Sequence, residues 1–133
     1  MALVVLDASV VIAFLDPDDA LHESAVDALA EHQHDDLVAS ASVYAEILVG
    51  PFRKGAQAVA AVEAFLEDFA VRIEPITPPI ARAAARLRGG SKRVRLPDAL
   101  VLATADEVGA DAVLTGDDSW AKISRRVRLV RSS

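Results

Sequence analysis

Short apolar segments alternate along this chain with longer segments that have the periodicity of helices. The apolar segments are ALVVL, DLVAS, VRIEPI, DAVLT and VRLV. ALVVL is a continuous, valine-rich run, which is typical of a strand buried on both faces. Strands separated by helices favour an α/β fold with a mainly parallel central sheet flanked by helices. With 133 residues, 53% of them hydrophobic, the chain is predicted to form a single domain over residues 1–133.

Capping and helix-breaking residues predict the helix boundaries. Acidic and hydroxyl side chains favour a helix start, whereas glycine and proline favour an end. Thr77-Pro78-Pro79 is a strong start signal, because a capping hydroxyl precedes proline in the first turn. The predicted helices run from Asp18 or Asp19 to Glu31, from Ser40 or Ser42 to Gly50-Pro51, from about Ala56 to Phe69, from Thr77 to just before Gly89-Gly90, and onward from Pro97.

Composition excludes several classes of protein. No apolar run approaches the ~18 residues that span a bilayer. The N-terminus has no basic region and reaches Asp7 too early for a signal peptide. The absence of cysteine excludes disulfides, thiolate catalysis and cysteine-based metal sites, and it fits a reducing cytosol. We therefore expect a soluble cytoplasmic protein that does not bind membranes.

Charge is distributed unevenly beneath the formal net charge of −6. Residues 1–52 contain ten acidic side chains and no lysine or arginine. Two basic groups follow, the first comprising Arg82, Arg86, Arg88, Lys92, Arg93 and Arg95, and the second Lys122, Arg125, Arg126, Arg128 and Arg131. Local potential attracts a polyanion, so an acidic chain can still bind nucleic acid. The alternative interpretation is that both groups are solvated surface.

Two carboxylates follow predicted strands. Asp7 ends the first strand, and Asp117 comes two residues after DAVLT. In open parallel sheets, ligands bind outside the carboxyl ends of the strands, where the strand order reverses. Both aspartates are therefore candidates for that edge of the sheet. Asp118 is an alternative to Asp117.

Two further carboxylates lie on predicted helices. Glu46 has Val43 and Val49 three residues away on its helix face, which predicts that its carboxylate points inward. Asp98 shares a stripe with Val101, Leu102 and Ala105 on a helix that is apolar nearly all round, which indicates burial. Four converging carboxylates would cost several kcal/mol in repulsion and desolvation. A hard divalent cation such as Mg²⁺ or Mn²⁺ would offset that cost.

Structural interpretations compete at each of these positions. Asp98 suits a first helical turn, where the helix dipole favours an acid. Asp7 suits the cap of a following helix, and Asp117 suits an ordinary turn. Trp120 is predicted to fill the core, since aromatic residues are too few to suggest an RNA-stacking surface. The three histidines have no metal-ligand spacing and are predicted to be solvated, namely His22, His32 and His34.

Four segments together resemble a known family. They are VLDASVV with Asp7 and Ser9, SVYAEIL with Glu46, LPDAL with Asp98, and VLTGDDSW with Thr115 and Asp117. Their order and spacing are similar to the four motifs of PIN-domain nucleases, and the small single-domain form resembles the VapC toxins of type II VapBC toxin–antitoxin systems. The resemblance covers essentially the whole chain and implies the PIN three-layer sandwich.

The resemblance implies a metal-dependent endoribonuclease of prokaryotic cytoplasm that leaves a 5′ phosphate. Asp7 and Asp98 would bind Mg²⁺ or Mn²⁺ directly, and Glu46 and Asp117 directly or through water. Ser9 and Thr115 would hydrogen-bond carboxylates or water. The implied RNA-binding residues are Arg53, Lys54, Arg88, Lys92, Arg93 and Arg95.

The implied partners are RNA, a cognate VapB-like antitoxin and a second copy of the chain. The antitoxin would direct a basic side chain into the acidic site. Two other functions stay open. One is a PIN-fold RNA- or protein-binding module without turnover, which does not need four converging carboxylates. The other is a small Mg²⁺-dependent phosphotransfer domain, but the first motif is Asp-x-Ser rather than Asp-x-Asp.

Overall fold

The computed structural model describes residues 1–131 and has a parallel five-stranded sheet at its centre. The strand order is β3-β2-β1-β4-β5, and every neighbouring pair is parallel. The strands are β1 (Leu3–Leu6), β2 (Asp36–Ser40), β3 (Arg72–Glu74), β4 (Ala112–Thr115) and β5 (Val127–Leu129). The predicted parallel sheet is confirmed.

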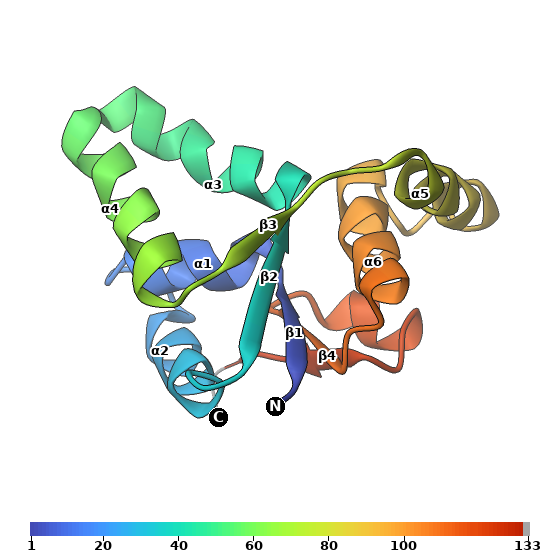
Figure 1. The fold of residues 1–133 in the computed structure, drawn as a ribbon, viewed down its shortest axis with the longest axis horizontal. Helices are drawn as coiled ribbons and strands as arrows, with labels where there is room; N and C mark the ends of the chain where they lie inside the picture. The colour runs from blue at the N-terminus through green and yellow to red at the C-terminus, as the bar shows by residue number, and fades with distance from the viewer. Residues whose placement is uncertain (132–133) are drawn as a thin grey trace.

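Helices cover both faces of this sheet and complete a three-layer sandwich (Figure 1). One side carries α1 (Ala8–Leu15), α2 (His22–Glu31), α3 (Ala41–Lys54) and α4 (Ala56–Asp68). The other side carries α5 (Pro78–Gly90) and α6 (Leu96–Val108). A short 3₁₀ helix, η1 (Asp118–Lys122), joins β4 to β5. The α/β class and layering agree with the prediction.

The central strand explains why the sheet is buried on both faces. β1 pairs with β2 on one side and with β4 on the other, and Val4, Val5 and Leu6 are fully buried. Trp120 is only 2% exposed, which confirms that it belongs to the core. The apolar helix α6 is buried as predicted, with Val101, Leu102 and Ala105 inside the core.

Two predicted helix ends are wrong. α3 continues through Gly50-Pro51 to Lys54, because proline in the last turns removes only one backbone hydrogen bond, and the helix stops at Gly55 with φ 133°. α5 continues through Gly89-Gly90 to its cap at Ser91. Glycine costs a helix about 1 kcal/mol. The packing of α5 against α6 offsets that cost.

Other local predictions also need correction. α2 begins at His22 without a side-chain cap, because Asp19 instead accepts a hydrogen bond from the Leu21 amide in a turn. β3 ends at Glu74, since Pro75 cannot donate to the ladder. Of the histidines predicted to be solvated, His34 is exposed, but His22 and His32 are half-buried. Their Nδ1 atoms lie 2.8 Å from the Ala13 carbonyl and the Asp35 carboxylate, respectively.

None of the helices formed by residues 1–131 has the length and apolar composition needed to cross a bilayer.

Candidate active site

The strand order reverses at β1, and in open parallel sheets the crevice that binds ligands lies at such a point, here outside the carboxyl ends of β1 and β4. From β1 the sheet extends to β2 and β3 on one side and to β4 and β5 on the other. Leu6 pairs with Leu114, and the Asp7 amide donates to the Leu114 carbonyl over 2.9 Å. Asp7 and the loop after Thr115 are therefore held together at the position where such sheets bind ligands.

Asp7 is 8% exposed and is held by three hydrogen bonds. Its Oδ1 accepts from the Ala8 amide over 2.8 Å, so Asp7 caps α1. Its Oδ2 accepts from the hydroxyls of Ser9 (2.7 Å) and Thr115 (2.8 Å). A carboxylate has about four lone-pair positions. These contacts leave Oδ1 able to accept one further ligand.

The hydroxyls of Ser9 and Thr115 also fix the position of the loop after β4. Ser9 Oγ accepts from the Gly116 amide, and Thr115 Oγ1 accepts from the Asp117 amide, each over 3.0 Å. A Cβ atom on Gly116 would lie 2.7 Å from Leu21 Cδ1, so a side chain at this position would require Leu21 to shift. Sequence reasoning missed Gly116, because the packing of Leu21 against it is a contact between distant segments.

Burial is the main cause of the raised pKa of Asp7. The hydrogen bonds from Ser9, Thr115 and Ala8 oppose it, while the nearby charge of Asp117 raises the pKa further. The hydrogen bonds therefore orient the Asp7 carboxylate, while burial makes its negative charge unfavourable. A cation bound beside it would offset that unfavourable charge.

Glu46 lies near the other carboxylates but is not buried as predicted. The residue is exposed on α3, and Val49 on the same predicted stripe is also exposed, whereas Val43 is buried. Protein around the carboxyl still removes part of its water and raises its pKa, and the charges of Asp7 and Asp98 raise it further. Glu46 thus adds its charge to this acidic group from an exposed position on α3.

Asp98 occupies the first turn of α6 and already faces one cation. Arg95 Nε lies 3.8 Å from Asp98 Oδ2, with the arginine side chain 82% exposed and the aspartate 19% exposed. Burial raises the pKa of Asp98; Arg95 lowers it, and Asp7 and Asp117 raise it. The ion pair is long and exposed on the arginine side, so it compensates only part of the acidic charge.

Asp117 contributes its charge to this group. It raises the pKa of both Asp7 and Asp98. Its Oδ1 accepts from the amide of Ser119 over 3.0 Å and from the hydroxyl of Ser119 over 2.6 Å. Ser119 was not among the predicted residues, although a serine two positions after an aspartate is a recognised turn signal.

The donor set suits Mg²⁺ or Mn²⁺ if water supplies part of the coordination. Within residues 1–131, no three acidic or histidine side chains are close enough to hold a metal ion by themselves. Mg²⁺ is commonly bound by one or two carboxylates and several waters, with substrate phosphate completing the shell. Asp7 and Asp98 fit that pattern, because both are partly desolvated oxygen donors that repel one another.

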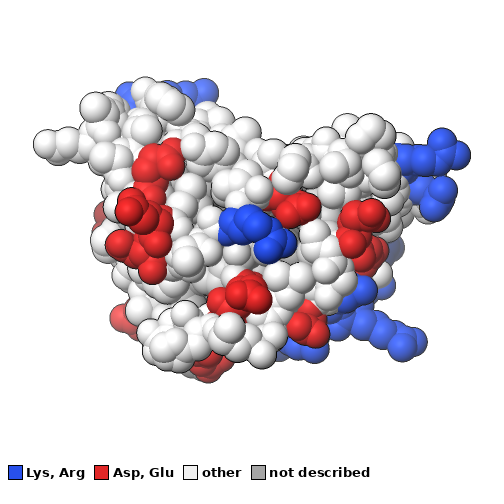
Figure 2. Space-filling view, viewed as in Figure 1, with Lys and Arg blue, Asp and Glu red and all other residues white. Residues whose placement is uncertain are grey.

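The predicted RNA-binding residues separate into two groups. Arg53 and Lys54 occupy the last turn of α3. The others lie at the end of α5 and in the loop before α6, namely Arg88, Lys92, Arg93 and Arg95. Figure 2 shows basic side chains on the right-hand side of the molecule, over α5, whereas acidic side chains lie on both the α4 side and the right-hand side of this face.

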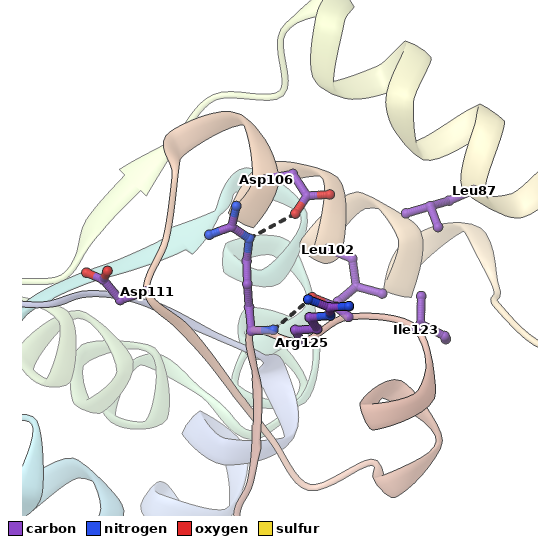
Figure 3. Close-up of a pocket in the computed structure, with 8 residues that line it drawn as sticks. Leu87, Leu102, Asp106, Asp111, Ile123 and Arg125 are labelled. Atoms are coloured by element: carbon purple, nitrogen blue, oxygen red, sulfur yellow. Dashed lines mark hydrogen bonds and ion pairs between the residues drawn. The ribbon is translucent and has the colours of Figure 1, made fainter.

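A different pocket, of about 510 Å³, lies at the opposite edge of the sheet (Figure 3). Asp111 and Arg126, which precede β4 and β5, both line it. Arg126 Nε pairs with Asp106 Oδ1 over 3.0 Å, so charge in this pocket is internally compensated. Among the described residues, its lining includes none of the four predicted carboxylates.

The fold and the acidic crevice define an α/β protein whose site lies at the switch point of a parallel sheet. The chain belongs to the PIN-domain family, whose sequence profile matches residues 4–126. No curated protein sequence matches the chain.

Several solved structures share this fold. A toxin–antitoxin complex from Klebsiella pneumoniae has a TM-score of 0.79 and 24% identity, covering 98% of this chain and 99% of that one. VapC20 of Mycobacterium tuberculosis, a toxin that cleaves the sarcin–ricin loop, has a TM-score of 0.77 and 21% identity, with coverage of 91% and 95%. VapBC-5 of M. tuberculosis has a TM-score of 0.63 and 29% identity, with coverage of 99% and 100%. The predicted resemblance to PIN domains and VapC toxins is confirmed.

Thr115→Val is expected to raise the pKa of Asp7 further. Valine keeps the branched shape but removes a hydrogen bond that favours the charged carboxylate. Carboxyl-detected NMR titration of the metal-free protein measures this change. Thr104→Val is a matched control, because Thr104 is also fully buried but donates to the Leu100 carbonyl of its own helix. An unchanged Asp7 pKa in Thr115→Val would contradict the role assigned to this hydroxyl.

Proposed function

We propose that this chain is a VapC-like toxin, an endoribonuclease that requires Mg²⁺ or Mn²⁺ and is inhibited by a cognate VapB-like antitoxin in a prokaryotic cytoplasm. The observation that carries the proposal is the grouping of Asp7, Glu46 and Asp98, whose pKa values are all raised, at the switch point of a PIN domain. A module that only binds RNA has no need to accept this electrostatic cost. The strand order also differs from the 2-1-3-4-5 order of receiver-type domains, so phosphotransfer has less support.

The position of each site residue would determine its role in metal binding and catalysis. Asp7 and Asp98 would hold the cation, and Glu46 and Asp117 would contact it directly or through water. When bound, the ion would supply Lewis acidity and would lower the pKa of water for phosphodiester hydrolysis. Ser9 and Thr115 favour the charged form of Asp7 and fix its orientation. Arg95, next to Asp98, compensates part of the acidic charge before the ion binds.

An apolar groove supports the proposed protein partners. It has a volume of about 270 Å³ and runs between α1, α3 and α4, with Ile12, Ile47 and Val62 in its lining and Glu46 at its margin. Phe52 is 69% exposed on α3. Exposed apolar surface of this kind marks protein interaction sites. An antitoxin segment lying in the groove would reach the acidic crevice past Glu46, and Phe52 is available to a homodimer.

Incubating the purified protein with total cellular RNA tests the proposed activity. Discrete new RNA ends carrying a 5′ phosphate are expected with Mg²⁺ or Mn²⁺ and are expected to be absent with EDTA, because the carboxylates need the cation. Sequencing of 5′ ends locates the cut. RNA that binds without new ends would support the binding-only module. New ends that appear equally with EDTA would refute metal dependence.

A further inference from the structure

Another pocket lies between the loop that follows α5, the 3₁₀ helix η1 and the end of β5. Its volume is about 550 Å³. That volume falls in the range of ligand pockets, roughly 300–1,000 Å³. Arg93, Lys122 and Arg131 contribute the cations of its wall, and Asp118 contributes one acid. The charged side chains that line the pocket are therefore positive on balance.

The three cations come from segments that are far apart in sequence. Arg93 lies in the loop before α6, Lys122 ends η1, and Arg131 follows β5. Within residues 1–131, their charged groups form no ion pair and no hydrogen bond with another side chain, even though Asp118 lines the same pocket. Arg126, in contrast, is paired with Asp106. The cations of this pocket are thus available to an anion.

The pocket is linked to the acidic crevice by the hydrogen bonds of Ser119. This residue lines the pocket, and its amide and hydroxyl both donate to Asp117 Oδ1. The negative charge of Asp117 in turn repels the charges of Asp7 and Asp98 and raises their pKa values. If a polyanionic ligand placed one phosphate at the carboxylates, the adjacent segment of that ligand would therefore lie beside the three cations.

We propose that Arg93, Lys122 and Arg131 form a subsite for a backbone phosphate of single-stranded RNA, adjacent to the phosphodiester that is cut. This inference rests on the proposed nuclease function. Ile123 and Leu129 supply an apolar surface for the sugar or base, while Trp120 is buried and unable to stack. The subsite therefore recognises the backbone and depends strongly on salt.

The test measures RNA binding without turnover. A fluorescein-labelled oligouridine RNA is titrated in EDTA at several NaCl concentrations, with fluorescence anisotropy as the readout. The variant Arg93→Ala/Lys122→Ala should weaken binding by about tenfold. The salt slope should fall by about 0.7 if both cations hold one phosphate, or by about 1.4 if they hold two. Both side chains are exposed, so melting curves should stay close to those of the parent.

Arg82→Ala/Arg86→Ala is the matched control, because it removes the same charge from exposed positions on α5 outside the pocket. It should keep the parent slope. An equal loss in both variants, an unchanged slope in the pocket variant, or a parent protein that does not bind RNA would overturn the subsite. Binding of polyglutamate with the same dependence on Arg93 and Lys122 would also overturn it in favour of an acidic peptide. Parent protein that binds through the pocket yet cuts no RNA with Mn²⁺ would refute the nuclease function and leave only the binding of backbone phosphate by these cations.

Discussion

Asp98→Asn is expected to lose at least about 100-fold of its metal-dependent RNA cleavage. Removing a hydrogen-bond partner of a metal ligand typically costs 10–100-fold, and loss of the ligand's own charge should cost at least the upper value. The amide keeps the shape of the side chain, and Arg95 is exposed enough to be rehydrated, so the fold should persist. Initial cleavage rates at saturating Mn²⁺ measure the effect.

Asp106→Asn is the control for this substitution. Asp106 lies on the same helix but pairs with Arg126 at the opposite edge of the sheet. Its replacement removes an equal charge without touching the crevice, so cleavage should stay near the parent rate. An Asp98→Asn variant that retains full activity at saturating Mn²⁺ would remove Asp98 from the set of metal-binding carboxylates.

Without metal, Asp98→Asn is expected to be at least as stable as the parent near pH 7. Burial and the charges of Asp7 and Asp117 raise the folded pKa of Asp98 above its unfolded value of about 4, against the opposing effect of Arg95. The native state therefore binds extra protons. This contribution to stability is fully present below the unfolded pKa and is lost as the pH rises through the folded pKa. The advantage of the asparagine variant should consequently shrink toward pH 4.

Mn²⁺ should reverse the order of stability. An ion that binds only the native state adds about 2.7 kcal/mol to the free energy of unfolding at 100 times its dissociation constant. The parent and Asp106→Asn should gain alike, and Asp98→Asn should gain less. Thermal melts across pH, with chelator or with Mn²⁺, measure both effects. An asparagine variant clearly less stable than the metal-free parent at neutrality would instead show that Asp98 serves the structure of the α6 N-terminus.

Local sequence signals predicted most of the scaffold because strand burial and helix caps depend on neighbouring residues. The apolar run of β1 and the Thr77 cap of α5 are examples, and both lie where expected. The helix ends predicted at Gly50-Pro51 and Gly89-Gly90 are wrong, since proline removes only one backbone hydrogen bond from α3 and packing against α6 offsets the cost of glycine in α5. Glu46 was placed inward from its spacing to Val43 and Val49. Which face of α3 is covered depends on what packs against it, and Val49 is uncovered.

The amino-acid sequence by itself determined the α/β class, the order of the four carboxylates and the hydroxyl residues beside them. Only the tertiary structure decided that the Thr115 hydroxyl meets Asp7, 108 positions away, and that Arg93, Lys122 and Arg131 share one pocket. The physical reason is that burial patterns and caps are properties of a short segment. Contacts between distant segments depend instead on strand order and register, which the packing of the whole sheet and its helices selects.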